Sequence, residues 1–344
     1  MKNPVFWSFV LLLLFSCEEN RRIKTVEKPK GWIILDTQVD ASLRGLSPIT
    51  ENIVWASGSN GTWLRTLDGG INWDSGVING LDSVDFRDIE GIDASTAIAM
   101  SSGQPALIFK TLDGGKTWEK KFEGSDKDFF DGMYFQRKKG IVLGDPVDNY
   151  WKILTTDDLG ETWKVSERSP KAKEGAGSFA ASGSTVMRDN NRIWFASGGL
   201  SSDIFFSDDD GMHWKIISTP ILQGEPSQGI FSFTKVSDQV LIAVGGDYLK
   251  SDFAEKNAII STDGGMSWEL IEGNLPKGYR SGISYFPLHH WLISVGPSGS
   301  DYSRDGGINW EKFSEEGFHA IFRDKAQSSI WASGSKGRIA KLDY

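Results

Sequence analysis

Hydrophobic residues along this 344-residue chain fall into short runs, many of which alternate with polar residues. NIVWAS (52–57), TWLRT (62–66) and ALIFKT (106–111) are typical, and turns rich in Gly, Asp and Ser separate them. Short alternating runs bounded by such turns predict β-strands. The abundant aromatic residues and glycines likewise favour short strands and tight turns over helices. The pattern therefore predicts an all-β protein.

One motif recurs six times with the pattern Ser/Thr-x-Asp-x-Gly-x-x-Trp, and we call each copy a box. Successive box tryptophans lie 45, 45, 51, 54 and 42 residues apart. A repeat of about 40–50 residues with four short strands per unit is typical of the blades of a β-propeller. The six boxes are TLDGGINW (66–73), TLDGGKTW (111–118), TDDLGETW (156–163), SDDDGMHW (207–214), STDGGMSW (261–268) and SRDGGINW (303–310).

The residue types of the box predict a structural role. The Asp carboxylate and the Ser/Thr hydroxyl can accept hydrogen bonds from main-chain N–H groups of a turn between the third and fourth strands of a blade. The Gly allows a backbone conformation that a side chain disfavours, and the Trp covers the turn. We therefore expect the box aspartates to shape turns and to take no part in catalysis. They are Asp68, Asp113, Asp158, Asp209, Asp263 and Asp305.

The pentapeptide WASGS occurs at 55–59 and again at 331–335, which predicts a seventh blade that has no box. Residues 318–344 would supply three of its strands, and GWIILDT (31–37) would supply the fourth, beginning at Trp32. Pairing residues 32–37 with 338–344 would close the ring and leave no unpaired strand edge in that blade. The predicted fold is one seven-bladed β-propeller with four-stranded antiparallel blades, the last closed by the N-terminal strand. The predicted blades are 42–77, 86–122, 128–167, 176–218, 229–272, 281–314, and 318–344 with 31–37.

The N-terminal segment has a different character. Residues 1–16 form an apolar stretch after an early lysine, which is typical of a signal peptide and too short to span a membrane. LFSC (14–17) resembles a bacterial lipobox, in which the cysteine is diacylated and becomes the mature N-terminus. Cys17 is the only cysteine, which disfavours a disulfide or metal-ligand role, and two acyl chains would anchor the protein at a membrane. We expect a lipoprotein of the cell envelope outside the cytoplasm, periplasmic or surface-exposed, with 18–30 as a flexible tether and 31–344 as a single domain.

We expect a ligand at the mouth of the central channel. Loops between second and third strands, and between blades, usually form the ligand face of a propeller, and these loops vary most in length here. A concave mouth with several charged groups is the usual place for binding. The expected ligand is a protein or a glycan, held by a monomer. The candidate mouth residues are Arg44, Arg87, Asp131, Asp145, Asp148, Glu174, Ser178, Asp247, Tyr248, Tyr279, Arg280 and His319.

An enzyme is the alternative interpretation, because propellers with this box include sialidases and other glycosidases. Three mouth arginines could supply positive charge, but we find no Arg-Ile-Pro stretch and no assignable Tyr–Glu pair. Carboxylate pairs drawn from Asp145, Asp148, Glu174 and Asp247 could serve another glycosidase mechanism. We favour a non-catalytic protein and keep the glycoside hydrolase as the alternative.

Other functional classes find little support. The four histidines lack metal-ligand spacing, and no Gly-x-Gly-x-x-Gly follows a strand, so we expect no metal and no cofactor. The formal net charge of −9 argues against a nucleic-acid partner.

The seven predicted blades, the Asp boxes and units of the form WASGSNGTWLRTLDGGINW (55–73) resemble the family of photosystem II stability/assembly factors and their relatives in non-photosynthetic bacteria. The resemblance covers residues 31–344, and its specific element is the Asp-box (BNR) repeat. It implies a non-enzymatic, membrane-associated propeller that binds a partner protein during assembly. A basic patch is associated with partner binding in that family, whereas this chain offers scattered arginines on the proposed face.

Overall fold

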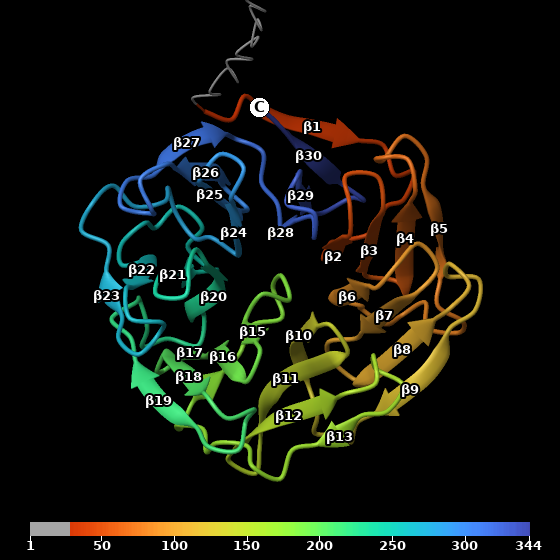
Figure 1. The fold of residues 1–344 in the computed structure, drawn as a ribbon, viewed down its shortest axis with the longest axis horizontal. Coiled ribbons are helices and arrows are strands. Elements are labelled where there is room, and N and C mark those ends of the chain that lie inside the picture. Colours follow the sequence, from red (N-terminus) through yellow and green to blue (C-terminus); the bar gives the residue numbers. More distant parts are fainter. Residues whose placement is uncertain (1–27) are drawn as a thin grey trace, which may run out of the picture.

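The computed structural model describes residues 28–344, which form thirty β-strands. Seven antiparallel sheets stand around a central axis, so the predicted seven-bladed propeller is confirmed (Figure 1). Within the described part of the chain, no helix is long and apolar enough to cross a membrane. The predicted signal peptide, the lipidation at Cys17 and most of the predicted tether lie outside the described residues.

The first four blades follow the repeat units in chain order. Their strands, from the axis outward, are β2 (Leu43–Pro48), β3 (Val54–Gly58), β4 (Thr62–Thr66) and β5 (Asp74–Val77) in blade 1; β6 (Asp88–Gly91), β7 (Ala97–Met100), β8 (Leu107–Thr111) and β9 (Glu119–Glu123) in blade 2; β10 (Phe130–Gln136), β11 (Lys139–Val147), β12 (Tyr150–Thr156) and β13 (Lys164–Val165) in blade 3; and β15 (Val186–Asp189), β16 (Arg192–Ala196), β18 (Asp203–Ser207) and β19 (Lys215–Ser218) in blade 4.

The last three blades complete the ring, and blade 5 gains two short strands at its inner edge. The strands are β20 (Gln228–Lys235), β21 (Leu241–Asp247), β22 (Ala258–Ser261) and β23 (Glu269–Leu270) in blade 5, extended by β14 (Ala176–Gly177) and β17 (Gly198–Gly199); β24 (Gly282–Phe286), β25 (Trp291–Gly296), β26 (Gly299–Ser303) and β27 (Glu311–Ser314) in blade 6; and β28 (Ala320–Arg323), β29 (Ile330–Ser333), β30 (Ile339–Asp343) and β1 (Gly31–Leu35) in blade 7.

The hydrophobic core lies between neighbouring blades, because each sheet buries both faces of its middle strands. In one such layer Trp194 and Phe206 of blade 4 pack with Ile230 and Leu241 of blade 5. The outermost strands are largely exposed, as the four residues of β5 illustrate. Burial of apolar surface between all neighbouring blades is what stabilises the ring, at about 25 cal/mol for each Å² removed from water.

The predicted closure of the ring is confirmed. Strand β1 pairs antiparallel with β30, and Trp32 lies opposite Leu342 in the register. The Trp32 indole donates to Ser300 Oγ of blade 6 at 3.0 Å, so this residue ties blade 7 to its neighbour. The two ends of the described chain therefore meet in one sheet (Figure 1).

The boxes occupy the turns between third and fourth strands, and their hydrogen bonds have the expected pattern. In the first box Thr66 Oγ1 accepts the Gly70 N–H and Asp68 Oδ1 accepts the Asn72 N–H, both at 2.9 Å. The Trp73 indole donates to the Gly70 carbonyl at 3.2 Å. Hydrogen bonds to Thr117 hold the pKa of the exposed Asp113 carboxyl at about 2. These aspartates are committed to their own turns.

Candidate functional site

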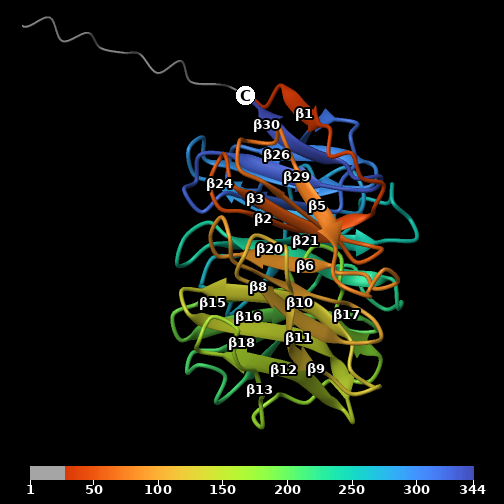
Figure 2. The same cartoon turned by 90° about the vertical axis from the view of Figure 1, so that its right-hand side faces the viewer.

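The ring has two ends that differ in construction. The boxes and the hairpins between first and second strands lie at one end, which we call the box end. The turns between second and third strands and the connections between blades lie at the other, which we call the loop end. Seen from the side, the ring is edge-on and the loops of its two ends lie on opposite sides (Figure 2).

A segment of the connection between blades 3 and 4 runs inside the ring and separates the two ends. This channel segment comprises residues 178–185, and most of its residues are buried. The Ala181 carbonyl accepts a hydrogen bond from Arg44 of blade 1 at 3.1 Å. Ser184 Oγ lies 2.6 Å from Ser232 Oγ of blade 5. A segment that contacts blades on opposite sides of the axis lies within the channel, as the central loop before β15 shows (Figure 1).

Several candidate mouth residues gather at the loop end, above the channel segment. Arg87 donates to Asp85 at 2.7 Å, and Asp145 Oδ1 accepts the Ser178 N–H at 2.9 Å. Asp131 is buried next to Asp145 and Arg87, and burial raises the pKa of its carboxyl well above the usual range. Neither carboxyl oxygen of Asp131 has a hydrogen-bond partner among the described residues. The mouth prediction thus brought together residues that do meet in space.

Two more predicted residues join this cluster. Burial and the neighbouring Arg87 lower the pKa of the Arg44 guanidinium. Burial, and then the nearby Arg44, lower the pKa of His319 to about 3, so this imidazole is neutral at neutral pH. Its Nε2 lies 3.2 Å from Ser42 Oγ and 3.0 Å from Ser335 Oγ. The loop end therefore holds fixed cations and a neutral histidine in a mostly buried layer.

An aromatic group lies beside the charged layer. Phe179 of the channel segment stacks on Phe231 with the ring centroids 3.8 Å apart, and Tyr279 meets Phe231 edge-on at 4.6 Å. Tyr248 contacts both phenylalanines edge-on. Tyr248 is half-exposed, and the adjacent Leu249 is 74% exposed. We call Phe179, Tyr248 and Leu249 the loop-end patch.

The remaining predicted residues lie apart from these groups or have other partners. Asp148 and Glu174 are exposed, and Asp148 pairs with Lys127 at 3.4 Å. Asp247 accepts hydrogen bonds from Gln228 at 3.2 Å and from the Leu249 N–H at 3.0 Å. Arg280 is fully buried and forms a salt bridge with Asp301 at 2.5 Å. Burial of this pair leaves Arg280 no surface to offer a ligand.

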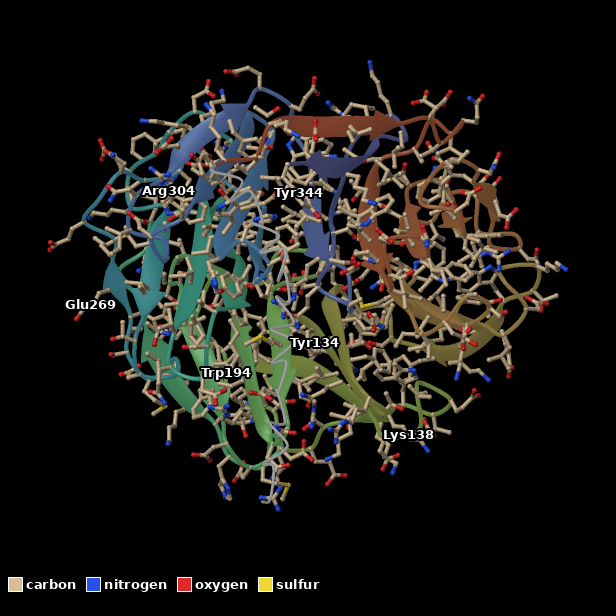
Figure 3. The ribbon with its side chains drawn as sticks, turned by 45° about the horizontal axis from the view of Figure 1, so that its top comes forward. Tyr134, Lys138, Trp194, Glu269, Arg304 and Tyr344 are labelled. Atoms are coloured by element: carbon tan, nitrogen blue, oxygen red, sulfur yellow. The ribbon has the colours of Figure 1, made fainter. Side chains whose placement is uncertain are left out.

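A cavity of the channel opens at the box end, away from the predicted mouth. It has a volume of about 1000 Å³ and is lined by inner strands of all seven blades. Glu90 pairs with Lys325 there, and Asp189 pairs with Lys235. Tyr134 and Arg323 face the cavity from opposite blades, and Figure 3 shows Tyr134 near the centre of the ring. Burial raises the pKa of the Tyr134 phenol and lowers that of the Arg323 guanidinium.

Sequence reasoning missed this cavity. Its residues belong to the ends of inner strands, for example Asp88 in β6 and Tyr134 in β10. The available signal was that polar residues interrupt otherwise apolar inner strands, as in FDGMYFQ (130–136). That signal points to the channel without saying which end is open.

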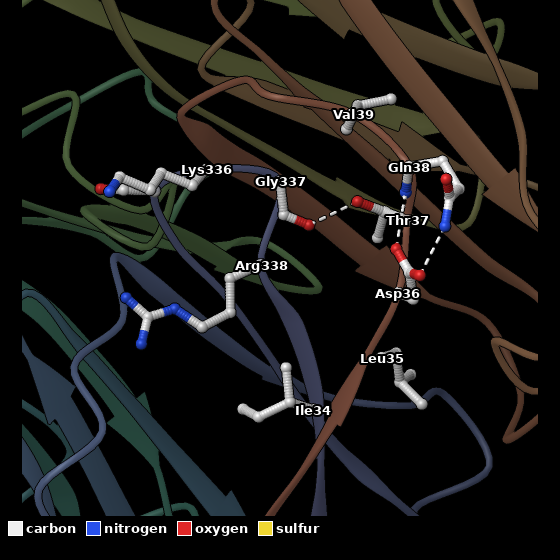
Figure 4. A pocket seen from close by; sticks show the side chains of 10 residues that line it. Ile34, Leu35, Asp36, Thr37, Gln38, Val39, Lys336, Gly337 and Arg338 are labelled. Carbon is white, nitrogen blue, oxygen red and sulfur yellow. Dashed lines mark hydrogen bonds between the residues drawn. The ribbon is translucent and has the colours of Figure 1, made fainter.

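A smaller groove of about 460 Å³ lies at the seam where the ring closes (Figure 4). Thr37 Oγ1 donates to the Gly337 carbonyl at 2.6 Å across this groove, and Asp36 accepts the Gln38 N–H at 3.1 Å. The Thr37 contact fastens the connection between β1 and β2 to the last hairpin, and the Asp36 contact is local to that connection. The groove therefore belongs to the closure of the ring.

No cluster of three or more metal-ligating side chains occurs within residues 28–344. The loop-end carboxylates of Asp145 and Asp247 are bonded to main-chain N–H groups of neighbouring turns. Both carboxylates are therefore fixed by hydrogen bonds to the main chain, and they do not stand free across an open cleft.

Three family models match parts of the chain. Residues 24–127 match the family described as photosynthesis system II assembly factor YCF48. Residues 151–282 match the sortilin and neurotensin receptor 3 family, and residues 301–312 match the BNR/Asp-box repeat. The resemblance to the assembly-factor family and the Asp-box repeat are thereby confirmed.

Individual relatives agree with these matches. The photosystem II assembly lipoprotein Ycf48 of Synechococcus sp. (strain CC9902) is 25% identical over 272 residues, which cover 69% of this chain and 78% of that protein. The solved structure of YCF48 bound to D1 peptide has a TM-score of 0.64 at 15% identity and covers 93% of this chain and 97% of that one. YCF48 from Cyanidioschyzon merolae has a TM-score of 0.62 at 15% identity, with 91% and 98% covered.

A hydrolase shares the fold as well. The GH74 xyloglucanase from Xanthomonas campestris has a TM-score of 0.58 at 13% identity, and the match covers 90% of this chain and 53% of that chain. At such low identity the structural likenesses establish the propeller fold alone.

Proposed function

We propose that this protein is a non-catalytic, membrane-anchored propeller that holds a segment of a partner protein at its loop end. The observation that carries the proposal is the loop-end patch, in which exposed Tyr248 and Leu249 continue the stack of the partly buried Phe179 on the buried Phe231. Rigid aromatic side chains backed by a packed core are the usual anchors of protein interfaces. The Arg44 and Arg87 cations beside them would orient a polar or acidic part of the same segment.

The state of the loop-end carboxylates supports binding over hydrolysis. A glycosidase needs two carboxyl groups that face each other across the substrate. Asp145 and Asp247 instead accept main-chain hydrogen bonds, and Asp148 is exposed beside Lys127. The glycoside hydrolase therefore remains the weaker of the two proposals.

The relatives point in the same direction. The Synechococcus relative is named a photosystem II assembly lipoprotein, and one solved structure is described as YCF48 bound to D1 peptide. For this chain we propose anchoring through acylated Cys17 and a partner that is itself a protein of the same membrane. A glycan at the loop end is the other outcome that an unbiased binding experiment can reveal.

A pull-down from solubilised membranes with the propeller tests the loop-end site. Changing Leu249→Ser or Arg87→Ala should reduce partner recovery at least about fivefold, because each removes an anchor or a charge from the contact. Arg323→Ala is the matched control at the box end and should leave recovery unchanged. Loss with Arg323→Ala alone would refute the loop-end site and move the partner to the box-end cavity.

Anchoring is tested separately. Cys17→Ala should abolish acyl-chain labelling and release the protein from membranes, because the variant cannot carry the proposed lipid anchor. No helix within residues 28–344 is long and apolar enough to replace that anchor. A Cys17→Ala protein that stays membrane-bound and is processed normally would refute the lipid anchor.

A further inference from the structure

The two ends of the described chain lie at the position where a seventh box would stand. In six blades the third strand ends in a box and the fourth strand begins after it. In blade 7 the third strand β30 ends at Asp343, and β1 begins beside it at Gly31. Lys30 donates from its main-chain N–H to the Asp343 carbonyl at 2.8 Å. The chain therefore enters the ring at the box end, between the boxes of blades 6 and 1.

Exposed apolar side chains mark the boxes on both sides of that entrance. Ile308 of the blade 6 box is 52% exposed, and Ile71 of the blade 1 box is 81% exposed. Leu67 in the blade 1 box is half-exposed. The same position as Ile71 and Ile308 is Met212 in blade 4 and Met266 in blade 5, and both are exposed. Large apolar residues recurring at one exposed position are unusual on a surface that only faces water.

The box does not need these side chains for its own stability. Its hydrogen bonds use the hydroxyl of the first residue, the carboxylate of the third and main-chain N–H groups. Blade 2 forms the same turn with Lys116 at the equivalent position. The turn is therefore indifferent to the residue there, and the apolar side chains are free to contact something outside the ring.

One unpaired cation lies beside the entrance. Lys30 pairs with Asp343 at 3.4 Å, whereas Arg304 forms no salt bridge with any described residue. The nearby Asp305 carboxylate is occupied by the Asn309 N–H and side-chain amide, at 2.9 and 2.8 Å. Side chains that combine apolar contacts with cations are the ones that settle at a lipid–water interface.

We propose that the box end, in the sector formed by Leu67, Ile71, Arg304 and Ile308, lies against the lipid bilayer. The proposal rests on the proposed anchoring at Cys17. Lys30 lies 13 residue steps after Cys17, which span at most about 45 Å when extended, so the anchor keeps the ring near the surface. Because the tether holds the ring close to the bilayer, the box end meets the lipid surface at an effective concentration in the millimolar range. A weak apolar contact is then sufficient to orient the ring. The loop end then faces away from the lipid, toward its partner.

The orientation can be measured on the full-length acylated protein in phosphatidylcholine vesicles that contain a nitroxide-labelled lipid. Because Cys17 is the only native cysteine and is acylated, a single bimane label can be placed through Ile71→Cys, Ile308→Cys or Leu249→Cys. We expect lipid quenching of the labels at 71 and 308 to be at least about threefold stronger than at 249. Equal quenching at both ends, or none at either, would overturn the docking.

Matched variants separate docking from its alternatives. Ile71→Ser should weaken quenching of a label at 308, whereas Lys116→Ser, at the same box position in blade 2, should not. In a control without lipid, the box-end labels could become shielded from water as the protein concentration rises. That result would assign the face to a second copy of this chain and overturn the proposal. Vesicle flotation is read in the same samples. Loss of flotation overturns the anchor itself, while flotation with unquenched labels overturns only the docking.

Discussion

At the scale of single residues, the six boxes differ at the position that follows the aspartate. Four boxes have Gly there with φ between 75° and 78°, whereas the third has Leu159 at φ 60° and the fourth has Asp210 at φ 64°. A leucine in the left-handed region destabilises the folded protein by about 1–2 kcal/mol. Glycine removes this strain, but it loses more conformational entropy on folding, which offsets part of the gain. Leu159 is thus a locally strained residue within a repeated turn.

We predict that Leu159→Gly raises the free energy of unfolding by about 0.5 kcal/mol, because the backbone relief exceeds the entropy cost. Urea denaturation measures the change. Asp210→Gly is the control, since it relieves the same backbone but loses ion pairs with Arg188 and Lys139, and it should destabilise the protein. A lower free energy of unfolding in Leu159→Gly would mean that the contacts of the leucine side chain stabilise the protein by more than the backbone strain at Leu159 destabilises it.

A second residue-scale prediction concerns Asp88, which faces the channel segment. Its carboxylate accepts the Met133 N–H at 2.7 Å, and burial raises its pKa to about 8. The folded state therefore holds a proton that the unfolded state, with an ordinary pKa near 4, has released. Between these two pH values the folded form binds more protons, so this group's contribution to stability falls as pH rises.

Asp88→Asn removes that titration while keeping an oxygen to accept the Met133 N–H. The difference in unfolding free energy between variant and parent should therefore shift in favour of the variant as pH rises from about 4 to 8. Chemical denaturation at several pH values measures it. A difference that stays flat across this range would show that Asp88 keeps an ordinary pKa in the folded protein.

At the scale of elements, β1 is the strand that closes the ring. The half-buried Trp32 packs on Phe318 with the ring centroids 5.0 Å apart and bonds Ser300 in blade 6. Removing a large, largely packed aromatic side chain costs about 3 kcal/mol. Trp32→Ala should lower the free energy of unfolding by about that amount, whereas Ile33→Ala on the exposed face of β1 should change it by less than about 0.5 kcal/mol.

Differential scanning calorimetry with limited proteolysis checks this prediction. Loss of closure should expose the sheet edge of β30, and cleavage should appear first in blade 7. Equal effects of Trp32→Ala and Ile33→Ala would contradict the view that β1 closes the ring through its inward-facing residue.

At the scale of the whole molecule, the repeat made the ring predictable and left its interior unpredicted. The box spacing and the second WASGS, which no box follows, are sufficient to predict seven blades and the pairing of Trp32 with the last strand, because both depend on the periodicity of the repeat. The assignment of loops to one end of the ring was enough to predict that Arg44, Arg87, Asp131 and His319 lie near one another.

The rest depends on contacts that have no periodicity. Sequence reasoning predicts Arg280 at the mouth, but Asp301 in β26 of the same blade holds it in the interior. The channel segment 178–185 read as one more connection between blades, and only its three-dimensional path takes it through the axis. Gly183 and Ser184 of that segment line the cavity, which opens at the box end, away from the predicted mouth.

The channel segment should therefore couple blades 1 and 2 to blade 5 across the axis, and Gly183 is the residue to change. It has φ 73°, and a Cβ there would lie 2.4 Å from an Asp88 carboxylate oxygen. Gly183→Ala should lower the free energy of unfolding by about 2–3 kcal/mol, through backbone strain and overpacking. Gly80→Ala is the control, since its φ is 70° with no atom within 4 Å of a Cβ, and backbone strain alone should cost about 1 kcal/mol. Hydrogen exchange should then rise in Gly183→Ala around Arg44, Asp88 and Ser232 together, in blades 1, 2 and 5. Faster exchange confined to blade 4 would mean that the segment merely fills the channel and does not join its walls.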